Sequence, residues 1–124
     1  MILGVGCDLV KIARIEKAMG NPRFAERIFT AGERALFAQS GTPGQFAAGR
    51  WAAKEAVAKA LSGGLSLCPP DCVEVLPDAL GKPCVVLSGA ALERMKALGG
   101  ASVRVSITHE GEYAMAFAVL EGEA

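Results

Sequence analysis

The first ten residues alternate large apolar side chains with small or polar ones, and this period of two predicts a β-strand over residues 1–10. One face of the strand carries the larger side chains, Leu3, Val5, Cys7 and Leu9. The other face carries Gly4, Gly6, Asp8 and Val10. Because two glycines leave open space beside one carboxylate, we expect a large group to approach Asp8 on that face.

Helical periodicity replaces this alternation in the next part of the chain. It predicts short helices over residues 11–19 and 23–28, separated by the helix-breaking sequence Gly20-Asn21-Pro22. The sequence Thr30-Ala31-Gly32-Glu33 fits a capping box, in which a hydroxyl and a carboxylate bind free backbone N–H groups at a helix start. It predicts a third helix that continues to about residue 38.

The longest helical pattern covers about residues 45–61, after a flexible connection at residues 40–44. Residues 63–64 are both glycine and are expected to end this helix. Two short apolar runs, 73–76 and 83–87, then predict two strands joined by a turn.

The last part of the chain predicts a helix over residues 90–98 and a hairpin of two strands, 102–109 and 113–120. The second hairpin strand is apolar on both faces, because Tyr, Met, Phe and Val alternate with Ala and Leu. Such a strand must be covered on both sides. In a domain this small, we expect helices to cover one face and a neighbouring subunit to cover the other.

The composition limits the class of protein. A length of 124 residues fits one domain, residues 1–124. Thirteen Lys and Arg balance thirteen Asp and Glu, which excludes a protein that holds nucleic acid by bulk positive charge. No apolar run reaches the roughly 20 residues of a membrane helix, and the start of the chain has no basic leader. We therefore expect a cytoplasmic protein that binds neither nucleic acid nor membrane.

The cysteines offer one alternative function. The segment Cys68-Pro69-Pro70-Asp71-Cys72 resembles half of a zinc knuckle. A structural zinc site takes four ligands, however, and the only histidine, His109, is far along the chain. Reduced, structural cysteines are therefore the favoured interpretation, and a small redox or zinc protein is the alternative.

Glu55 and Lys59 lie four residues apart and share one side of the predicted long helix. One interpretation is an exposed ion pair that contributes about 0.3–0.5 kcal/mol. The surrounding residues are almost all Ala or Val, and a charge in such surroundings is costly without a partner. A functional role for the pair therefore has equal weight.

Asp8 is the second isolated carboxylate of the sequence. Together with Glu55 it would suit Mg²⁺, which takes few protein oxygens and keeps water and phosphate ligands. Lys59 near such an ion would face phosphate oxygens. The pattern indicates magnesium-assisted chemistry on a phosphate, but the spacing alone does not bring Asp8 to Glu55. His109 by itself is more typical of a hydrogen-bonded strand end than of a catalyst.

Three stretches, in order along nearly the whole chain, carry a family signature. The first is Val5-Gly6-Cys7-Asp8-Leu9-Val10 with Arg14. The second joins residues 23–30 and Glu33 to Gly49-Arg50-Trp51-Ala52-Ala53-Lys54-Glu55-Ala56-Val57-Ala58-Lys59-Ala60. The third joins Gly81-Lys82-Pro83 and Val105-Ser106-Ile107-Thr108-His109. In these stretches the sequence resembles the short bacterial holo-[acyl-carrier-protein] synthases, a type of 4′-phosphopantetheinyl transferase.

The resemblance implies an α+β fold, with a small antiparallel sheet packed on one long and several short helices, assembled as a homotrimer. It implies that coenzyme A donates its 4′-phosphopantetheine arm to a serine of apo acyl carrier protein, releasing adenosine 3′,5′-bisphosphate, for fatty acid biosynthesis. In such enzymes the residues that match Asp8 and Glu55 hold magnesium. Lys59 would support the phosphates, and a bound water, ranked ahead of Glu55, would accept the serine proton.

The resemblance also implies two sets of binding residues. Those expected along coenzyme A are Arg50, Lys54, Gly63, Pro83, Thr108 and His109. Acyl carrier proteins are strongly acidic, so a basic patch should face them despite the zero net charge. The docking candidates are Arg14, Arg23 and Arg27. A noncatalytic subunit that only binds the carrier or coenzyme A is the alternative, and the intact Asp8, Glu55 and Lys59 argue against it.

Overall fold

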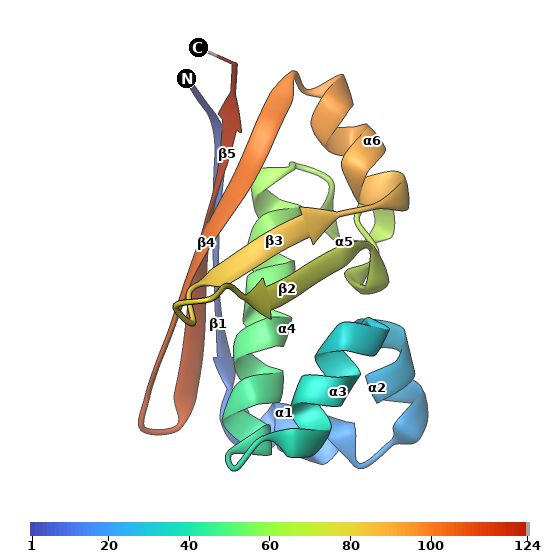
Figure 1. The fold of residues 1–124 in the computed structure, drawn as a ribbon, viewed down its shortest axis with the longest axis vertical. Coiled ribbons are helices and arrows are strands. Elements are labelled where there is room, and N and C mark those ends of the chain that lie inside the picture. The colour runs from blue at the N-terminus through green and yellow to red at the C-terminus, as the bar shows by residue number, and fades with distance from the viewer. Residues whose placement is uncertain (124) are drawn as a thin grey trace.

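A three-stranded antiparallel sheet lies along one side of the computed structural model and packs on one long central helix (Figure 1). The structure describes residues 1–123. The strand order is β1 (Ile2–Lys11), β5 (Tyr113–Gly122), β4 (Gly100–Glu110). Asp8 of β1 lies opposite Ala116 of β5, which in turn lies opposite Ile107 of β4. β5 is therefore the central strand, and β1 lies at one edge of the sheet.

Two further strands, β2 (Val73–Pro77) and β3 (Pro83–Leu87), form a separate antiparallel sheet. This hairpin crosses in front of the long helix in Figure 1 and shares no backbone ladder with the other three strands. The α+β prediction is confirmed, with the strands divided between two small sheets.

The helices include every one that the sequence predicts. They are α1 (Ile12–Met19), α2 (Pro22–Ile28), α3 (Ala31–Gln39), α4 (Pro43–Ala60), α5 (Gly64–Leu67) and α6 (Gly89–Ala97), with a 3₁₀ turn at Pro70–Cys72. The capping box at the start of α3 is present: Glu33 N–H donates to Thr30 Oγ1 at 3.3 Å, and Thr30 N–H donates to Glu33 Oε1 at 2.9 Å. Only the single turn of α5 has no counterpart among the predicted helices.

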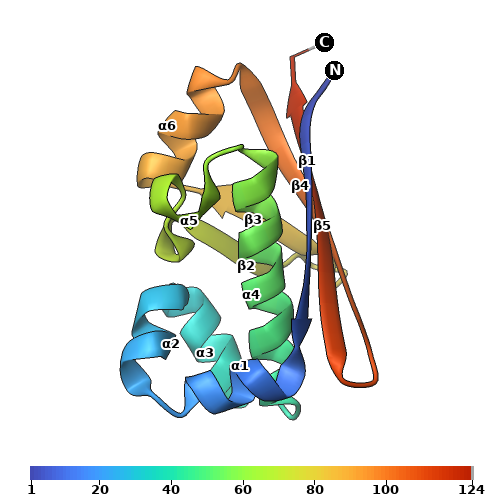
Figure 2. The ribbon, with the colours of Figure 1, turned by 180° about the vertical axis from the view of Figure 1, so that it is seen from behind.

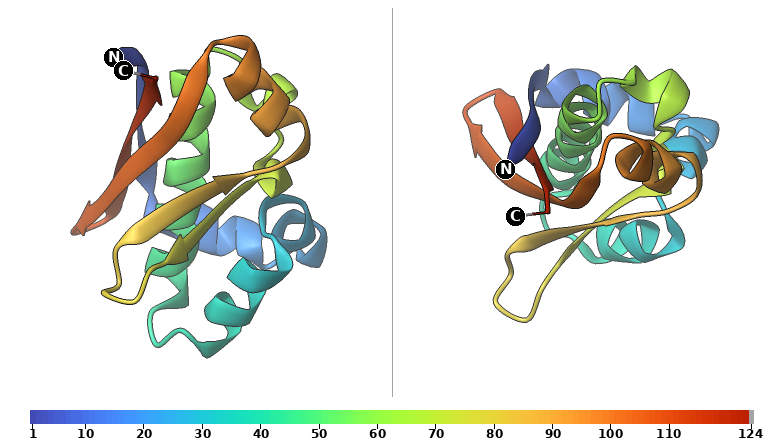
Figure 3. Two further views of the ribbon diagram at one scale, coloured as in Figure 1. Left: turned by 45° about the horizontal axis from the view of Figure 1, so that its top comes forward. Right: turned by 90° about the horizontal axis from the view of Figure 1, so that it is seen from above.

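Small side chains let α4 pack closely on its neighbours. The alanines at positions 47, 48, 52, 53, 56, 58 and 60 are at most 1% exposed. In the view from above, α4 lies on one side of the three-stranded sheet, and the β2–β3 hairpin crosses on another side of α4 (Figure 3). Although α4 is long and rich in alanine, neither it nor any other helix within residues 1–123 is apolar enough to cross a membrane.

The glycines of β1 mark the place where this packing is tightest. A Cβ on Gly4 would lie 2.2 Å from the carbonyl oxygen of Ala60, and a Cβ on Gly6 would lie 2.1 Å from that of Ala56. The expectation that a separate large group fills this space is therefore wrong, because α4 of the same chain fills it. The glycines allow the backbones of β1 and α4 to approach each other directly.

The two faces of the three-stranded sheet differ sharply in exposure. On the inner face, Ala114, Ala116, Ala118 and Leu120 of β5 are 0% exposed. On the outer face, Tyr113, Met115 and Phe117 are 40%, 41% and 44% exposed. Neighbouring exposed side chains of β1 extend this apolar outer face: Leu3, Val5 and Leu9. The helices thus cover one face, as predicted, and the outer face is bare in a single chain.

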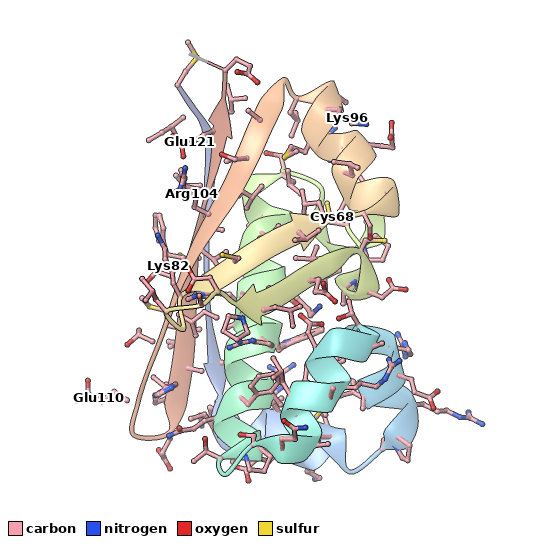
Figure 4. The ribbon with its side chains drawn as sticks, in the orientation of Figure 1. Cys68, Lys82, Lys96, Arg104, Glu110 and Glu121 are labelled. Carbon is pink, nitrogen blue, oxygen red and sulfur yellow. The ribbon has the colours of Figure 1, made fainter. Side chains whose placement is uncertain are left out.

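The first and last strands run side by side. Gly122 N–H donates to the carbonyl oxygen of Met1 at 2.8 Å, and the start of β1 and the end of β5 lie at the same end of the molecule (Figure 2). Near them on the outer face, the side chains of Arg104 and Glu121 point toward each other (Figure 4), with Arg104 Nε 2.8 Å from Glu121 Oε1. This exposed pair lies at the end of the sheet near the chain termini, beyond the apolar side chains of β1 and β5.

Candidate active site

The edge of β1 and one side of α4 bring Asp8 and Lys59 together. Lys59 Nζ lies 3.2 Å from Asp8 Oδ1 and donates a hydrogen bond of 2.9 Å to the carbonyl oxygen of Cys7. The side chain of Lys59 is 52% exposed and that of Asp8 is 16% exposed. The carboxylate of Asp8 is thus mostly buried, and the ammonium of Lys59 lies between it and the solvent.

Glu55 completes this group. Partial burial raises the pKa of Glu55 above its ordinary value, and the negative charge of Asp8 raises it further. The positive charges of Lys59 and Arg14 lower the pKa of Glu55 and oppose these effects. Asp8 and Glu55 therefore lie close enough to repel each other, which the spacing in the sequence did not establish.

The pair of carboxylates fits a hard divalent cation. Magnesium takes oxygen ligands and commonly uses one or two carboxylates, leaving its other positions to water and substrate phosphates. A cation between Asp8 and Glu55 would relieve the repulsion that raises the pKa of Glu55. Residues 1–123 contain no cluster of three or more His, Cys, Asp and Glu side chains that could hold a metal. Within residues 1–123, Asp8 and Glu55 therefore form a pair of carboxylates that is not part of a larger cluster of such side chains.

Lys54, which the family resemblance assigns to coenzyme A, lies inside the protein. Its side chain is 0% exposed, and Nζ is 2.8 Å from Glu33 Oε1. The ammonium also donates to the carbonyl oxygens of Pro70, at 2.7 Å, and Val73. Burial lowers the pKa of Lys54, and the charge of Glu33 opposes that change. All three protons of the ammonium therefore have internal acceptors, which corrects the expected contact with a phosphate.

Glu33 is a buried residue whose second role the sequence analysis missed. Besides its capping bond to Thr30, it accepts a hydrogen bond of 2.7 Å from Val75 N–H and pairs with Lys54. A capping glutamate normally faces solvent, so the capping box gave no signal of this role. The signal available in the sequence was the lysine itself, set among alanines on α4, which needs a partner if it is buried.

Arg50 lies one turn before Lys54 on α4 and also contacts β2. Arg50 Nε donates to the carbonyl oxygen of Val75 at 3.1 Å, and its guanidinium carbon is 4.5 Å from the centre of the Phe46 ring. The open edge of β2 is therefore bonded to side chains of α3 and α4 instead of to another strand. Arg50 is half-buried, and part of its side chain faces solvent.

Gly63 lies just beyond α4, but it is not the residue that reverses the helix. Ser62 has the left-handed φ of +56°, a conformation that usually requires glycine. A Cβ on Gly63 would lie 2.9 Å from the Cβ of Leu67, so this glycine is needed for packing against α5. The prediction that glycines 63 and 64 end the helix is thus corrected by one position.

The other residues expected on coenzyme A lie away from Asp8. Pro83 begins β3 and borders a cavity of about 360 Å³ between β3 and β4, together with Lys82 and Arg104. Thr108 and His109 are exposed on β4, with central strand β5 between them and β1. Because Thr108 and His109 are adjacent in a strand, their side chains point to opposite faces of the sheet. A single chain therefore does not gather these three residues around Asp8.

The docking candidates are exposed. Arg14 lies on α1, and Arg23 and Arg27 lie on α2. Arg27 also borders a cavity of about 610 Å³, together with Phe24 and Trp51, whose ring centroids are 5.6 Å apart. The positive charge of Arg14 lowers the pKa of Glu55, so Arg14 is the docking candidate whose charge reaches the carboxylate pair.

The four cysteines carry free thiols. Cys68 is buried, and Cys72 is partly buried. Burial raises the pKa of the Cys68 thiol, which makes it less reactive as a nucleophile. Cys7 and Cys84 are exposed on different strands.

Comparison with known proteins assigns this arrangement to a class of enzymes. Residues 4–118 match the model of the 4′-phosphopantetheinyl transferase superfamily, and the chain belongs to that superfamily. Within it, the chain is similar to the holo-[acyl-carrier-protein] synthase of Shewanella amazonensis, with 47% identity over 122 residues, covering 96% of this chain and 98% of that protein. The family predicted from the three sequence stretches is therefore confirmed.

Solved structures show the same relationship. The chain is similar to the holo-[acyl-carrier-protein] synthase of Neisseria meningitidis, with a TM-score of 0.90, 35% identity, and coverage of 98% of this chain and 99% of that one. It is also similar to the Helicobacter pylori enzyme in complex with coenzyme A, with a TM-score of 0.82, 30% identity, and coverage of 94% and 99%. The fold prediction is thus confirmed over nearly the whole chain.

Proposed function

We propose that this protein transfers the 4′-phosphopantetheine arm of coenzyme A to a serine hydroxyl of an apo acyl carrier protein. The observation that carries the proposal is the meeting of Asp8, Glu55 and Lys59 at the edge of β1, in a chain of the 4′-phosphopantetheinyl transferase superfamily. In support, the relatives from Shewanella amazonensis and Neisseria meningitidis are holo-[acyl-carrier-protein] synthases, and the Helicobacter pylori enzyme binds coenzyme A.

In the reaction, the serine oxygen forms a bond to the phosphorus that carries the pantetheine, and the bond from that phosphorus to the leaving phosphate breaks. The leaving group is adenosine 3′,5′-bisphosphate, and the serine proton passes to a base. Asp8 and Glu55 would hold magnesium, which when bound supplies positive charge to the pyrophosphate as the negative charge grows. The pair would also fix where the pyrophosphate lies.

Lys59 binds the same phosphates. Its side chain is 52% exposed, and within residues 1–123 its polar partners are Asp8 and the carbonyl oxygen of Cys7, so the ammonium is accessible to an anion. The raised pKa of Glu55 makes it a better base than an ordinary carboxylate, but a carboxylate that also holds a cation loses basicity. We therefore assign the serine proton first to a water beside Glu55.

The proposal includes a homotrimer with shared sites. Two observations support it: the apolar outer face of the sheet is bare, and Pro83, Thr108 and His109 lie away from Asp8 in one chain. A neighbouring copy on the outer face would bury Phe117 and its surroundings and would bring a second set of coenzyme A contacts to the β1 edge. Arg50 and Gly63 belong to the proposed coenzyme A contacts as well, and Lys54 does not.

Exposed arginines on α1 and α2 would bind the acidic carrier protein. Arg14, Arg23 and Arg27 provide positive charge beside the carboxylate pair, although the whole chain is neutral. The serine of a carrier docked there would arrive close to Glu55. We place the reaction in the cytoplasm, in fatty acid biosynthesis.

The test is a transfer assay with purified protein, coenzyme A, magnesium and apo acyl carrier protein, read by the mass of the carrier. We expect a gain of one phosphopantetheine. Asp8→Asn and Glu55→Gln should each lower the initial rate at least about 100-fold, because each removes a charged group that acts at the transferred phosphate. Glu93→Gln, which neutralises an exposed carboxylate on α6, is the matched control and should keep the wild-type rate.

Two results would overturn the proposal. A carrier of unchanged mass after incubation with the folded wild-type protein would favour a binding subunit without turnover. Wild-type rates in both Asp8→Asn and Glu55→Gln would show that the carboxylate pair does not act in the transfer.

A further inference from the structure

The turn that ends α4 has an unusual residue at its reversal point. Ser62 N–H donates to the carbonyl oxygen of Lys59 at 3.0 Å, and Gly63 N–H donates to that of Ala58 at 3.2 Å. These two bonds define a Schellman motif, whose left-handed position is usually glycine. Here that position is Ser62, and within residues 1–123 it is the one residue other than glycine with a positive φ. The turn is therefore strained.

Arg94 of α6 holds this turn from outside. Its Nε donates to the carbonyl oxygen of Leu61 at 2.9 Å, and Nη2 donates to that of Ser62 at 3.4 Å. Carbonyl groups at the end of a helix lack partners within the helix, so the guanidinium supplies them. The contact joins residues more than thirty positions apart in the sequence, and it fixes the direction of the chain as it leaves α4.

The far side of the turn is held as well. Gly63 lies against α5, where a Cβ would meet the Cβ of Leu67 at 2.9 Å and Cys68 Sγ at 3.5 Å. Figure 4 shows Cys68 in the same region, between α6 and the end of the β2–β3 sheet. The turn is thus in contact with α5 through Gly63 and hydrogen-bonded to α6 through Arg94.

The turn is directly connected to the proposed site. Ser62 is bonded to the carbonyl oxygen of Lys59, and Gly63 is one of the proposed contacts of coenzyme A. We infer that Arg94 is a positioning residue for coenzyme A binding: it holds Ser62 in the left-handed conformation and so sets the place of Gly63 and of the last turn of α4. This inference rests on the proposed function.

The test compares four variants in the transfer assay, with the Michaelis constant for coenzyme A and kcat measured separately. In Arg94→Met we expect the Michaelis constant to rise about 3- to 10-fold with kcat little changed, because the loss of the two hydrogen bonds at the turn reaches the coenzyme A contacts only indirectly. Lys96→Met removes an equal charge from the same helix, where the side chain is 61% exposed and its ammonium lies 3.8 Å from Glu93 Oε1, and should match the wild type.

Substitution of Ser62 provides the rescue. Glycine adopts a left-handed φ without strain, so the turn no longer depends on Arg94. The double variant Arg94→Met with Ser62→Gly should therefore recover most of the wild-type Michaelis constant, and Ser62→Gly alone should match the wild type. A direct contact between Arg94 and a phosphate predicts the opposite, because glycine cannot replace the lost charge.

Three other outcomes also bear on the role of Arg94. If Arg94→Met lowers kcat in proportion to its folded fraction, measured by thermal denaturation, and leaves the Michaelis constant unchanged, Arg94 is only structural and the inference is wrong. A failure of rescue by Ser62→Gly also overturns it. If Arg94→Met does not fold, Arg94→Lys, which keeps the positive charge but lacks the forked geometry of the guanidinium, must show the increase. Absence of transfer by the wild type would contradict the proposed function and not the role of Arg94.

Discussion

Lys54 and Lys59 lie on the same helix, and their ammonium groups have opposite environments. Lys54 is 0% exposed and bound to Glu33, whereas Lys59 is 52% exposed beside Asp8. A buried ammonium with all its protons bonded stabilises one arrangement of the chain around it. An exposed ammonium with one carboxylate partner is available to a substrate phosphate. Lys54 thus has a structural role, and Lys59 is the lysine that is available for the proposed chemistry.

Removal of Lys54 should be far more damaging than removal of Lys59. Lys54→Met leaves Glu33 buried without its counter-charge, which is expected to lower the free energy of unfolding by about 3–5 kcal/mol. Lys59→Met breaks a partly exposed pair and should change it by about 1 kcal/mol or less. Urea denaturation of both variants measures the difference. Lys54→Met combined with Glu33→Gln should lose less than Lys54→Met alone, and equal stability of the two single variants would contradict the prediction.

Glu55 should give the protein a distinctive dependence on pH. Because burial and Asp8 raise its folded pKa, the folded state favours the protonated form. The stability that this provides is full below the ordinary pKa of 4.5 and is lost as the pH rises through the folded pKa. Relative to Glu55→Gln, the wild type should therefore become less stable between about pH 4 and pH 7.

Urea denaturation of both proteins across this pH range measures that change. Glu93→Gln, which alters an exposed carboxylate, is the control and should show no such trend. A constant difference between the wild type and Glu55→Gln at all pH values would show that Asp8 and burial do not act on Glu55 in the folded protein.

At the scale of elements, the different sides of α4 contact different neighbours. One side meets β2 through Arg50 and Lys54, another meets β1 through the backbone at Ala56 and Ala60, and Glu55 lies at the β1 edge. The elements themselves could be predicted from the sequence, because capping residues and apolar periodicity act locally. The side that each charged residue of α4 occupies could not, because small residues surround the helix on every side.

Other features that the sequence did not predict have the same physical cause. The glycines of β1 predicted open space, because the backbone of α4 that occupies this space comes from a distant part of the chain. Ser62 gave no signal of a left-handed turn because Arg94, which holds it there, is also distant in sequence. The candidate pair Asp8 and Glu55 was predicted by residue type, whereas its proximity required the packing of β1 on α4.

The end of α4 allows a direct test of its strain. Ser62→Gly should raise the free energy of unfolding by about 1 kcal/mol, because glycine reaches a left-handed φ without the clash of a Cβ. For a chain of this size, the change corresponds to an increase in Tm of about 4 °C. Ser62→Ala keeps the clash and is the control. Equal values of Tm for Ser62→Gly and Ser62→Ala would show that the turn carries no strain.

At the scale of the whole molecule, the apolar outer face of the sheet explains the hydrophobic content of 52%. Leu3, Val5, Leu9, Met115 and Phe117 all contribute to this face, and each is more than a third exposed. Contiguous apolar surface of this kind marks a site of association. The neutral total charge is likewise a sum over unlike regions, with arginines on α1 and α2 and carboxylates at the β1 edge.

A charge on the outer face should therefore dissociate the proposed trimer. Phe117→Glu places a carboxylate at the centre of the apolar face, and the mass measured by light scattering should fall to the 12.8 kDa of one chain. Transfer activity should fall with it, since the proposed site is shared between neighbouring copies. Leu80→Glu, at a position 94% exposed on the β2–β3 turn, is the control and should leave the mass unchanged. A wild-type protein of monomer mass would contradict the assembly.

The close approach of β1 to α4 helps to set the distance between the carboxylates of Asp8 and Glu55. Gly6 lies two residues before Asp8, and Ala56, which it contacts, follows Glu55. The separation of the two carboxylates is thus set largely by the contact of the Gly6 backbone with the backbone of α4. One added methyl group at position 6 would widen that separation and leave every charge in place, so Gly6→Ala separates the effect of distance from the effect of chemistry.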